Sequence, residues 1–481
     1  MNNNKIKFKA YGAAITALVI VAVILLNVIF GVVGKRYNLK VDITKGGVFT
    51  LSNETKNVLD MVKKDITIYY ATNADSRNTG YAEILDNFAK YSKHITIKDV
   101  NIDLDPNFKK TYQVESYNTV VVECPNTGKK RVIDSSLIEQ SSNNSKGTVA
   151  TSVNYLESYV SAAVLYSISS DPLDVYISVG HGEITENTTF LDHLMSMLYS
   201  EAMSVRVLDL TAEQIPENAD MILIAGPKMD FTADEIKKVD DYFEKGGRVQ
   251  FYSNPAYSLP NLNAYLNDSW KIQINNDCVS DDDGKYLAKS SIGSYLLPVI
   301  KESDMTKYLS AIGAKFRVQE GETNSIKVTE NKNIQANVLL TTSEKGISLT
   351  RDNWVKKNSR QSYVAQNNGE QTIMIYCKKN PLNNESTTAR LLVCGSYYML
   401  YDNFIDPSSN YADKDLVVKS INYMSGIEDA PVSVASKQVL NEQMKVLEIP
   451  KLVSYGVILV AAIPVILFIW GVYVYIRRKR L

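Results

Sequence analysis

The chain has 481 residues, of which 45% are hydrophobic and 22% charged, and its formal net charge at pH 7 is −1. This length and composition are typical of two or three domains with their own hydrophobic cores, which excludes a wholly disordered protein. A net charge near zero, without a stripe of Lys and Arg interleaved with aromatic residues, argues against a nucleic-acid partner.

The first predicted element is a transmembrane helix at residues 11–33, which follows a short cytoplasmic N-terminus at residues 1–10. The run from Tyr11 to Val33 contains no charged residue, and about 20 apolar residues are enough to cross a bilayer core. The run is longer than the apolar core of a cleaved signal peptide, which is roughly 7 to 15 residues, and no small-x-small site follows it. We therefore expect an uncleaved anchor.

A second transmembrane helix is predicted at residues 452–475, before a basic tail at residues 476–481. By the positive-inside rule, the Lys and Arg residues of this tail place the C-terminus in the cytoplasm, and two spans then place the N-terminus there too. The sequence thus predicts a protein of the cytoplasmic membrane with extracytoplasmic main domains. An inverted orientation is the alternative, because long loops translocate regardless of their charge.

Four widely spaced cysteines form no C-x-x-C pair: Cys124, Cys278, Cys377 and Cys394. The spacing argues against a metal site or a dithiol redox centre. Outside the cytoplasm disulfides are permitted, and four cysteines allow three full pairings that the sequence does not separate. Buried, unpaired thiols are the alternative.

Residues 34–170 are predicted to form the first extracytoplasmic domain. Helical and strand-like periodicities predict, in order, a helix capped by Ser52, a strand at 65–71, a helix at 82–91, a strand at 94–102, a hairpin of strands 117–124 and 130–134, and a helix at 148–169. The order β-α-β, β-β, α resembles a thioredoxin-like domain that lacks the redox cysteines.

The second domain is predicted at residues 171–426, and strand-like and helix-like segments alternate four times between Pro172 and Pro255. Short apolar β-branched runs separated by helical periodicity are typical of a parallel sheet covered by helices. A β-rich insertion at about 271–379 is expected to form a subsidiary sheet from the runs KFRVQE, ANVLLTT, SYVAQ and QTIMIYC. A strand at 389–400 and a helix at 413–424 then complete the α/β domain.

Two further segments of the second half have simple interpretations. Residues 427–451 are predicted to form an amphipathic stalk, in which helical periodicity leads into the second span. The loop Asp281–Asp283 lacks the D-x-D-x-D-G spacing and the trailing Glu of a calcium site, which favours a solvated acidic turn.

Ligands of parallel sheets bind at the carboxyl ends of the strands. This rule selects the residues that directly follow the predicted strands: His181, Gly182 and Glu183 after the first, Gly226 and Pro227 after the third, and Asn254 and Pro255 after the fourth. We expect these residues to line a ligand-binding crevice.

Catalytic motifs are missing from these positions. An amidotransferase-type site needs a nucleophilic Cys on a tight turn, activated by a His and a carboxylate, and no cysteine stands on such a turn. Ser396 lies in CGSYY, which lacks the G-x-S-x-G elbow. His94 and His193 have no visible reason to converge with His181, so no zinc site is predicted. No P-loop or dinucleotide fingerprint occurs, so no cofactor is predicted.

Several motifs recur in a characteristic order: VDITKGGVFTLSNETKNVL after the first span, GHGE after a strand, ADMILIAGP with TADEIKKVDDYFEKGGRVQFYSNP, and LLVCGSYYML. Through their order and spacing the chain resembles the GldG-type family of gliding-motility ABC-transporter auxiliary proteins. The resemblance implies a mixed α/β fold: a thioredoxin-like domain, then a flavodoxin-like domain related to class I glutamine amidotransferases, flanked by two transmembrane helices.

The resemblance also implies a function. Such proteins work beside an ABC-2-type permease and a separate ATPase, with no catalysis of their own. We expect a non-catalytic subunit, held in the lipid bilayer, whose external domains bind a substrate or partner of unknown identity. The alternative is an exported hydrolase or transferase that uses His181 and Glu183 as its acid-base pair.

Overall fold

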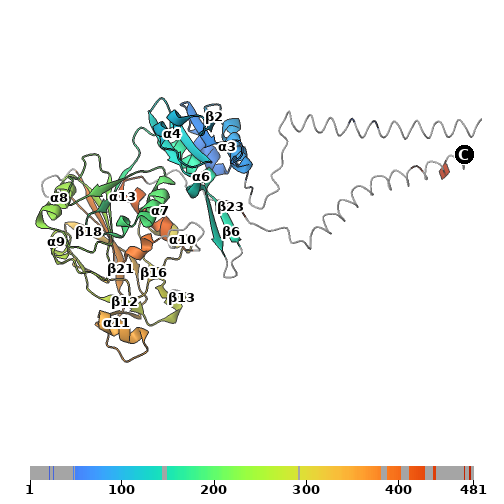
Figure 1. The fold of residues 1–481 in the computed structure, drawn as a ribbon. Helices are drawn as coiled ribbons and strands as arrows, with labels where there is room; N and C mark the ends of the chain where they lie inside the picture. Colours follow the sequence, from blue (N-terminus) through green and yellow to red (C-terminus); the bar gives the residue numbers. More distant parts are fainter. Residues whose placement is uncertain are drawn as a thin grey trace, which may run out of the picture. The chain divides into compact units, whose positions relative to one another are not determined.

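The computed structural model describes residues 49–143, 149–290, 293–380, 387–401 and 411–427, together with residues 21, 25, 47, 437–439, 471 and 476–477 (Figure 1). Met1–Leu51 and Ser52–Leu481 form two compact units. All the helices and strands named below belong to the second unit.

A four-stranded mixed sheet with the order β2-β1-β3-β4 follows the start of this unit. Strand β1 pairs in parallel with β2 and antiparallel with β3, which forms a hairpin with β4. The elements are α2 (Asn53–Asp60), β1 (Ile66–Thr72), α3 (Thr79–Tyr91), β2 (Ile95–Asn101), α4 (Pro106–Tyr112), β3 (Thr119–Cys124), β4 (Lys129–Ile133), α5 (Ser135–Ile138) and α6 (Leu156–Ile168). The predicted Ser52 cap is confirmed, since its side chain accepts a hydrogen bond from the Thr55 amide.

Two predictions for this region are wrong. The helix expected at 148–169 begins as strand β6 (Val149–Asn154), because Val149, Thr151 and Val153 alternate at strand spacing. Strand β6 pairs with β5 (Glu139–Asn143) and with β23 (Lys437–Val439). The stalk predicted at 427–451 is therefore a strand at 437–439, and most of its remainder lies outside the described residues.

An eight-stranded sheet forms the core of the second half, with the order β15-β18-β21-β22-β10-β9-β7-β8. Five neighbouring strands run parallel, as the alternating pattern predicts. They are β7 (Asp174–Val179), β8 (Ser204–Asp209), β9 (Met221–Ala225), β10 (Arg248–Tyr252) and β22 (Ala389–Cys394). Strand β22 is shorter than the predicted 389–400 and is followed by the 3₁₀ helix η3 (Tyr397–Leu400).

The insertion does more than form a subsidiary sheet. Its strands β15 (Val299–Ile300), β18 (Ile334–Thr341) and β21 (Thr372–Lys379) extend the main sheet in antiparallel fashion. Five consecutive residues of β21, from Ile373 to Cys377, are buried, as in a strand covered on both faces. The run SYVAQ forms no strand.

Three small sheets complete the insertion. They contain β11 (Ile272–Ile274) with β17 (Ile326–Val328); β12 (Cys278–Asp281) with β19 (Gly346–Leu349) and β20 (Asn367–Asn368); and β13 (Leu287–Ser290) with β14 (Gly293–Leu296) and β16 (Val318–Gln319). The acidic loop is not fully solvated, because Asp281 is 1% exposed and accepts hydrogen bonds from the Ser343 amide and hydroxyl.

Helices cover both faces of the main sheet (Figure 1). Helices α7 (Thr188–Tyr199), α10 (Lys307–Ala311) and α13 (Asp413–Met424) bury one face, which includes Ile177 and Leu392. Helices α8 (Ala233–Glu244) and α9 (Pro260–Trp270) bury the other, which includes Ile224 and Leu391. Short elements η1 (Ile184–Glu186), η2 (Gly284–Tyr286) and α11 (Arg351–Asn358) lie in connections.

The two flanking transmembrane helices of the predicted fold are not supported. Crossing a bilayer core takes about 20 helical residues, and none of the described helices is long and apolar enough to do so. Helices α3 and α6 have only 13 residues each. Almost all of the predicted spans, 11–33 and 452–475, and of the terminal segments, 1–10 and 476–481, lie outside the described residues.

The cysteines form no disulfide. Cys124, Cys278, Cys377 and Cys394 are all buried and all free. Of the two alternatives left open by the sequence, the buried thiols are correct.

Arg131 of β4 joins the four-stranded sheet to the second half of the chain. The side chain is 9% exposed, and its Nη1 and Nη2 atoms donate to the backbone oxygens of Tyr199 (3.0 Å) and Met203 (2.6 Å). The guanidinium also lies 3.9 Å from the ring centroid of Tyr166. Burial lowers the pKa of Arg131 to about 10, which leaves the side chain charged at neutral pH.

We expect Arg131→Met to destabilise the full chain by about 2 kcal/mol, because two buried carbonyl groups lose a charged donor. Chemical denaturation followed by tryptophan fluorescence measures the change. Lys93→Met is the matched control, since Lys93 is exposed, and surface substitutions change stability by about 0.5 kcal/mol or less. Equal unfolding midpoints for the two variants would show that the bonds from Arg131 to Tyr199 and Met203 contribute nothing measurable to stability.

Candidate functional site

The residues predicted from the strand ends do come together. Strands β7, β9 and β10 are neighbours in the sheet and run parallel, so their carboxyl ends lie at one edge. At this edge the Asn254 side chain donates to the Gly226 oxygen (3.3 Å), and the amides of Lys228 and Met229 donate to the His181 oxygen (2.8 and 3.0 Å). The loops after the three strands therefore form one connected structure.

The loop after β7 needs glycine at two positions. Gly180 has a φ of 107° and Gly182 a φ of 68°, in the left-handed region that side chains rarely adopt. This turn brings both amides onto one acceptor, Oε1 of Glu186, at 3.1 Å from Gly180 and 2.8 Å from Gly182. The carboxylate of Glu186, an exposed residue, thus closes the loop from outside.

His181 lies between two carboxylates. Its ring is buried, stacks on Phe231 with centroids 4.0 Å apart, and places Nε2 at 3.2 Å from Oε2 of Glu235. Its Nδ1 atom lies 3.6 Å from Oε1 of Glu183. Glu183 also accepts from the Ser178 hydroxyl and from the His181 amide, both at 2.6 Å. Both carboxylate oxygens of Glu183 therefore accept hydrogen bonds within the fold.

The charges of this cluster stabilise one another. Burial lowers the pKa of His181, but hydrogen bonds and charges from Glu183 and Glu235 outweigh it, so the pKa is raised. Burial raises the pKa of Glu183, yet its bonds to His181, Ser178 and backbone amides hold it below the ordinary value. The pKa of Glu235 is also lowered, because bonds to Thr232 and His181 outweigh burial. All three pKa shifts favour the charged form of the group concerned.

The insertion closes the strand ends of β10 and β22. The amide of Asn324 donates to the Gly395 oxygen (2.8 Å), and its Oδ1 atom accepts from the Ser253 hydroxyl (2.6 Å). The Ser396 hydroxyl donates to the Glu322 oxygen (2.7 Å). A segment of the insertion thus covers the carboxyl ends of β10 and β22.

The predicted crevice is filled as a result. His181, Glu183, Gly226, Pro227, Asn254 and Pro255 are buried, and only Gly182 is partly exposed. The Tyr397 ring covers Gly226 so closely that a side-chain Cβ there would lie 2.9 Å from its Cγ atom. Burial raises the pKa of Cys394, at the end of β22, to about 12, whereas reactive cysteines have a lowered pKa.

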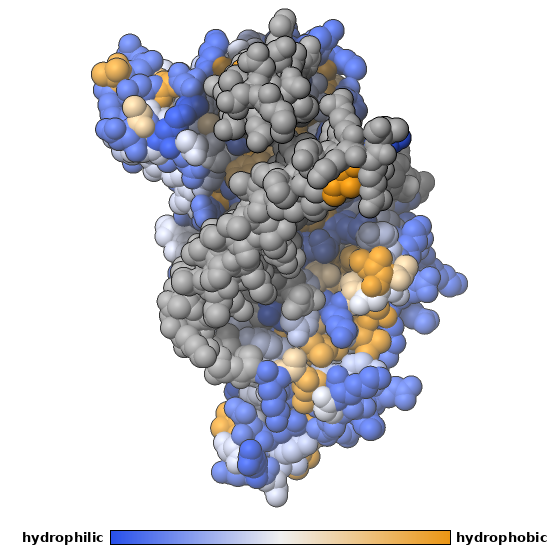
Figure 2. Space-filling view, turned by 90° about the vertical axis from the view of Figure 1, so that its right-hand side faces the viewer, coloured by the Kyte–Doolittle hydropathy of each residue, from blue (hydrophilic) through white to orange (hydrophobic). Residues whose placement is uncertain are grey.

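Exposed side chains surround the filled crevice. Lys228 and Met229 of the loop after β9 and Tyr257 beyond β10 are exposed, the last two at 55% and 46%. The face shown in Figure 2 is mostly hydrophilic, with hydrophobic side chains gathered in patches. The rim of the strand ends is therefore the solvent-exposed part of this edge.

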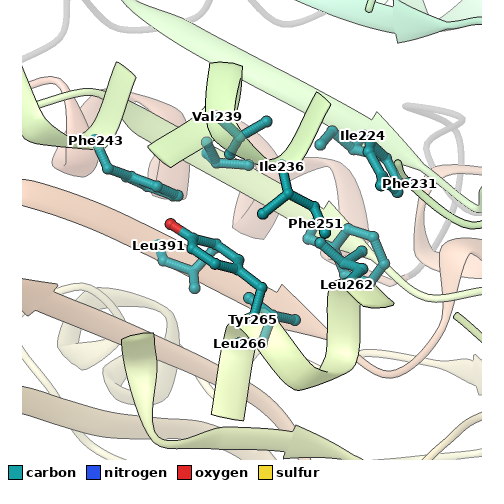
Figure 3. Close-up of a pocket in the computed structure, with 11 residues that line it drawn as sticks. Ile224, Phe231, Ile236, Val239, Phe243, Phe251, Leu262, Tyr265, Leu266 and Leu391 are labelled. Carbon is teal, nitrogen blue, oxygen red and sulfur yellow. The ribbon is translucent and has the colours of Figure 1, made fainter. Parts of the chain in front are cut away.

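An apolar hollow lies beneath the rim, between α8, α9 and the sheet. Figure 3 shows apolar side chains from these elements converging on it, among them Phe231, Phe251 and Leu391. The hydroxyl of Tyr265, another lining residue, donates to Asp240 (2.7 Å). Among the described residues that line it, the hollow offers no free polar group to orient a ligand, so we assign it to the hydrophobic core.

Sequence reasoning missed three residues that complete the cluster. Glu235 belongs to the capping box of α8 with Thr232, a T-x-x-E signal that the sequence does display. Phe231 precedes that box, and only the fold shows its contact with His181. Glu186 has no signal in the sequence. The described residues include no group of three or more His, Cys, Asp or Glu that could hold a metal ion.

A family model described as an ABC-type uncharacterized transport system matches residues 173–420. A second model, a domain of unknown function (DUF7088), matches residues 45–139. No curated protein matches the sequence.

Solved structures show weaker similarity. The mmIFT52 N-terminal domain is 15% identical, with 52% of this chain and 97% of that chain covered and a TM-score of 0.37. A ThuA-like protein from Parabacteroides merdae is 10% identical, with 53% and 90% covered and a TM-score of 0.31. A domain of alkylhydroperoxide reductase AhpF from Enterococcus faecalis is 12% identical, with 33% and 77% covered and a TM-score of 0.20. Similarity at these TM-scores carries no conclusion about this chain.

Proposed function

This chain belongs to the ABC-type uncharacterized transport system family, and on that basis we propose that it is a non-catalytic auxiliary subunit of an ABC-2-type transporter. The family match covers every strand of the eight-stranded sheet and all of its covering helices except the end of α13. Family membership implies association with transporter components. A permease and a separate ATPase, as in the gliding-motility systems, are the partners that we propose.

The observation that supports binding over catalysis is the burial of the His181 cluster. A general acid-base residue must come within hydrogen-bond reach of the substrate. His181 is 2% exposed and Glu183 is 1% exposed, and both already bond to protein groups. We propose that these two residues, with Gly226, Pro227, Asn254 and Pro255, position the loops of the strand ends, while Gly182 and the rim contact the ligand or partner. The subunit then works at the cytoplasmic membrane, on the extracytoplasmic side of the permease.

Affinity purification of the tagged full chain from gently solubilised cells tests this role. We expect a permease and an ATPase subunit to co-purify with the chain and to be identified by mass spectrometry. An unrelated tagged protein of the same compartment is the control. Recovery of the chain without either subunit, at a yield that allows detection of an equimolar partner, would contradict the proposal.

A further inference from the structure

The loops after β7 and β9 meet where the order of the strands reverses. Strand β8 lies on one side of β7, and β9 lies on the other. Helix α7, which follows β7, packs on one face of the sheet, and α8, which follows β9, packs on the opposite face. The connections therefore diverge between β7 and β9. In open α/β sheets, such a switch point is where ligands bind.

The β7 loop presents two amides at this switch point. The N–H groups of Gly180 and Gly182 converge on Oε1 of Glu186, at 3.1 and 2.8 Å. Backbone amides of one short loop that point to one position form an anion-binding nest, and here the two amides flank that of His181, which donates to Glu183. Here the nest already holds a carboxylate, so its geometry accepts an oxyanion. The bound oxygen belongs to an exposed residue of the same chain.

A cation lies beside the nest. The side-chain stem of Lys228, from the β9 loop, passes 3.4 Å from the position that a Cβ atom on Gly182 would take. Lys228 is exposed. Amides from one loop and a lysine from the other thus flank the switch point. Together they provide the donors and the positive charge that an anionic group requires.

We propose that this switch point binds the carboxylate or phosphate group of a ligand, and that Glu186 fills the site until the ligand displaces it. Glu186 is separated from Gly182 by only three residues, so its effective concentration at the nest is high. An external anion must compete with it and binds the wild-type chain weakly. This anion site rests on the proposed function in one respect: both assume that a ligand binds at the strand ends.

Isothermal titration calorimetry of the full chain with inorganic phosphate tests the site. We expect Glu186→Ala to bind inorganic phosphate at least tenfold more tightly than the wild type, because the nest is empty and one negative charge is removed. Adding Lys228→Met should reverse most of the gain. Glu186→Gln, which keeps the side-chain carbonyl but not its charge, should show an intermediate affinity and serves as the readout if the alanine variant does not fold.

Glu217→Ala is the matched control, because it removes an exposed carboxylate away from the nest. A similar gain in Glu217→Ala would assign the effect to net charge and overturn the proposal, as would a Glu186→Ala variant that binds no more tightly than the wild type. A phosphate titration in the presence of acetate separates the two ligand chemistries. If acetate weakens phosphate binding, the site accepts either a carboxylate or a phosphate group. Co-purification of a permease is independent of these titrations, so the two proposals fail separately.

Discussion

Replacement of Gly395 by alanine is expected to destabilise the protein by about 3 kcal/mol, at the upper end of the usual cost of an overpacked core. A Cβ atom at this position would lie 2.0 Å from the backbone oxygen of Asn324 and 3.0 Å from its carbonyl carbon. Backbone atoms cannot rotate away as the end of a side chain does. The substitution must therefore displace the insertion segment or the end of β22.

The Asn324 segment has little freedom to move. Its amide donates to the Gly395 oxygen, and its side chain bonds to the Ser253 hydroxyl (2.6 Å) and the Asp277 oxygen (2.9 Å). Next to it, Ser325 donates from its amide and hydroxyl to the buried Asp277 carboxylate. A shift of the segment would break several buried hydrogen bonds, each worth about 1 kcal/mol.

Gly284→Ala is the matched control for this substitution. A Cβ atom at Gly284 meets no atom within 4 Å, so its effect on stability should stay within about 0.5 kcal/mol. Urea denaturation of both variants, with the wild type as reference, measures the difference. If Gly395→Ala unfolds at the same urea concentration as the control, the insertion is a loose cover and the strand-end crevice is open to ligands.

Local patterns in the sequence were sufficient to predict the parallel strands and the position of their ends. Each of β7, β9 and β10 is a short apolar run that ends at Gly, Pro, Asn or Ser, and hydrogen bonding of parallel neighbours then brings the ends together. The same reasoning places His181, Gly226 and Asn254 side by side. These predictions succeed because periodicity and turn residues are properties of adjacent positions.

The filling of the crevice depends on residues that are far apart in the chain. Asn324 contacts Gly395 across 71 positions and Ser253 across the same number. No periodicity in the insertion indicates that its loop returns to the strand ends, or that β18 and β21 join the main sheet. Nor does the sequence indicate that His181 is held between Glu183 and Glu235, although the capping box of α8 does mark Glu235 as a fixed side chain.

The transmembrane helices were predicted from two long apolar runs without charged residues, from the missing cleavage site and from the basic tail, all of which are properties of the sequence and not of a folded helix. Hydropathy counts residues, whereas a span needs all backbone groups bonded within one helix over the thickness of the bilayer. Among the described elements the helices are too short for this role. The thioredoxin-like order, by contrast, depends on strand and turn signals, and its predicted hairpin of β3 and β4 is confirmed.

His181→Gln is expected to lower the free energy of unfolding by about 3 kcal/mol near pH 5.5, because it leaves two buried carboxylates without their cation. The cost should depend on pH in a defined way. The raised pKa of His181 gives stability that is complete below its ordinary value of 6.5 and is lost as pH rises through the folded pKa. The lowered pKa values of Glu183 and Glu235 give stability that is present above 4.5 and is lost as pH falls.

The difference in unfolding free energy between the wild type and His181→Gln should therefore be largest between pH 4.5 and 6.5 and decline on both sides. Denaturation series at several pH values measure it. The control is His94→Gln, since His94 pairs with an exposed Asp65 (3.0 Å), and such surface pairs contribute about 1 kcal/mol or less. A cost that is as large well above pH 6.5 and well below pH 4.5 as it is between these values would mean that His181 is neutral in the folded protein. Its ring would then stabilise the loops through stacking on Phe231.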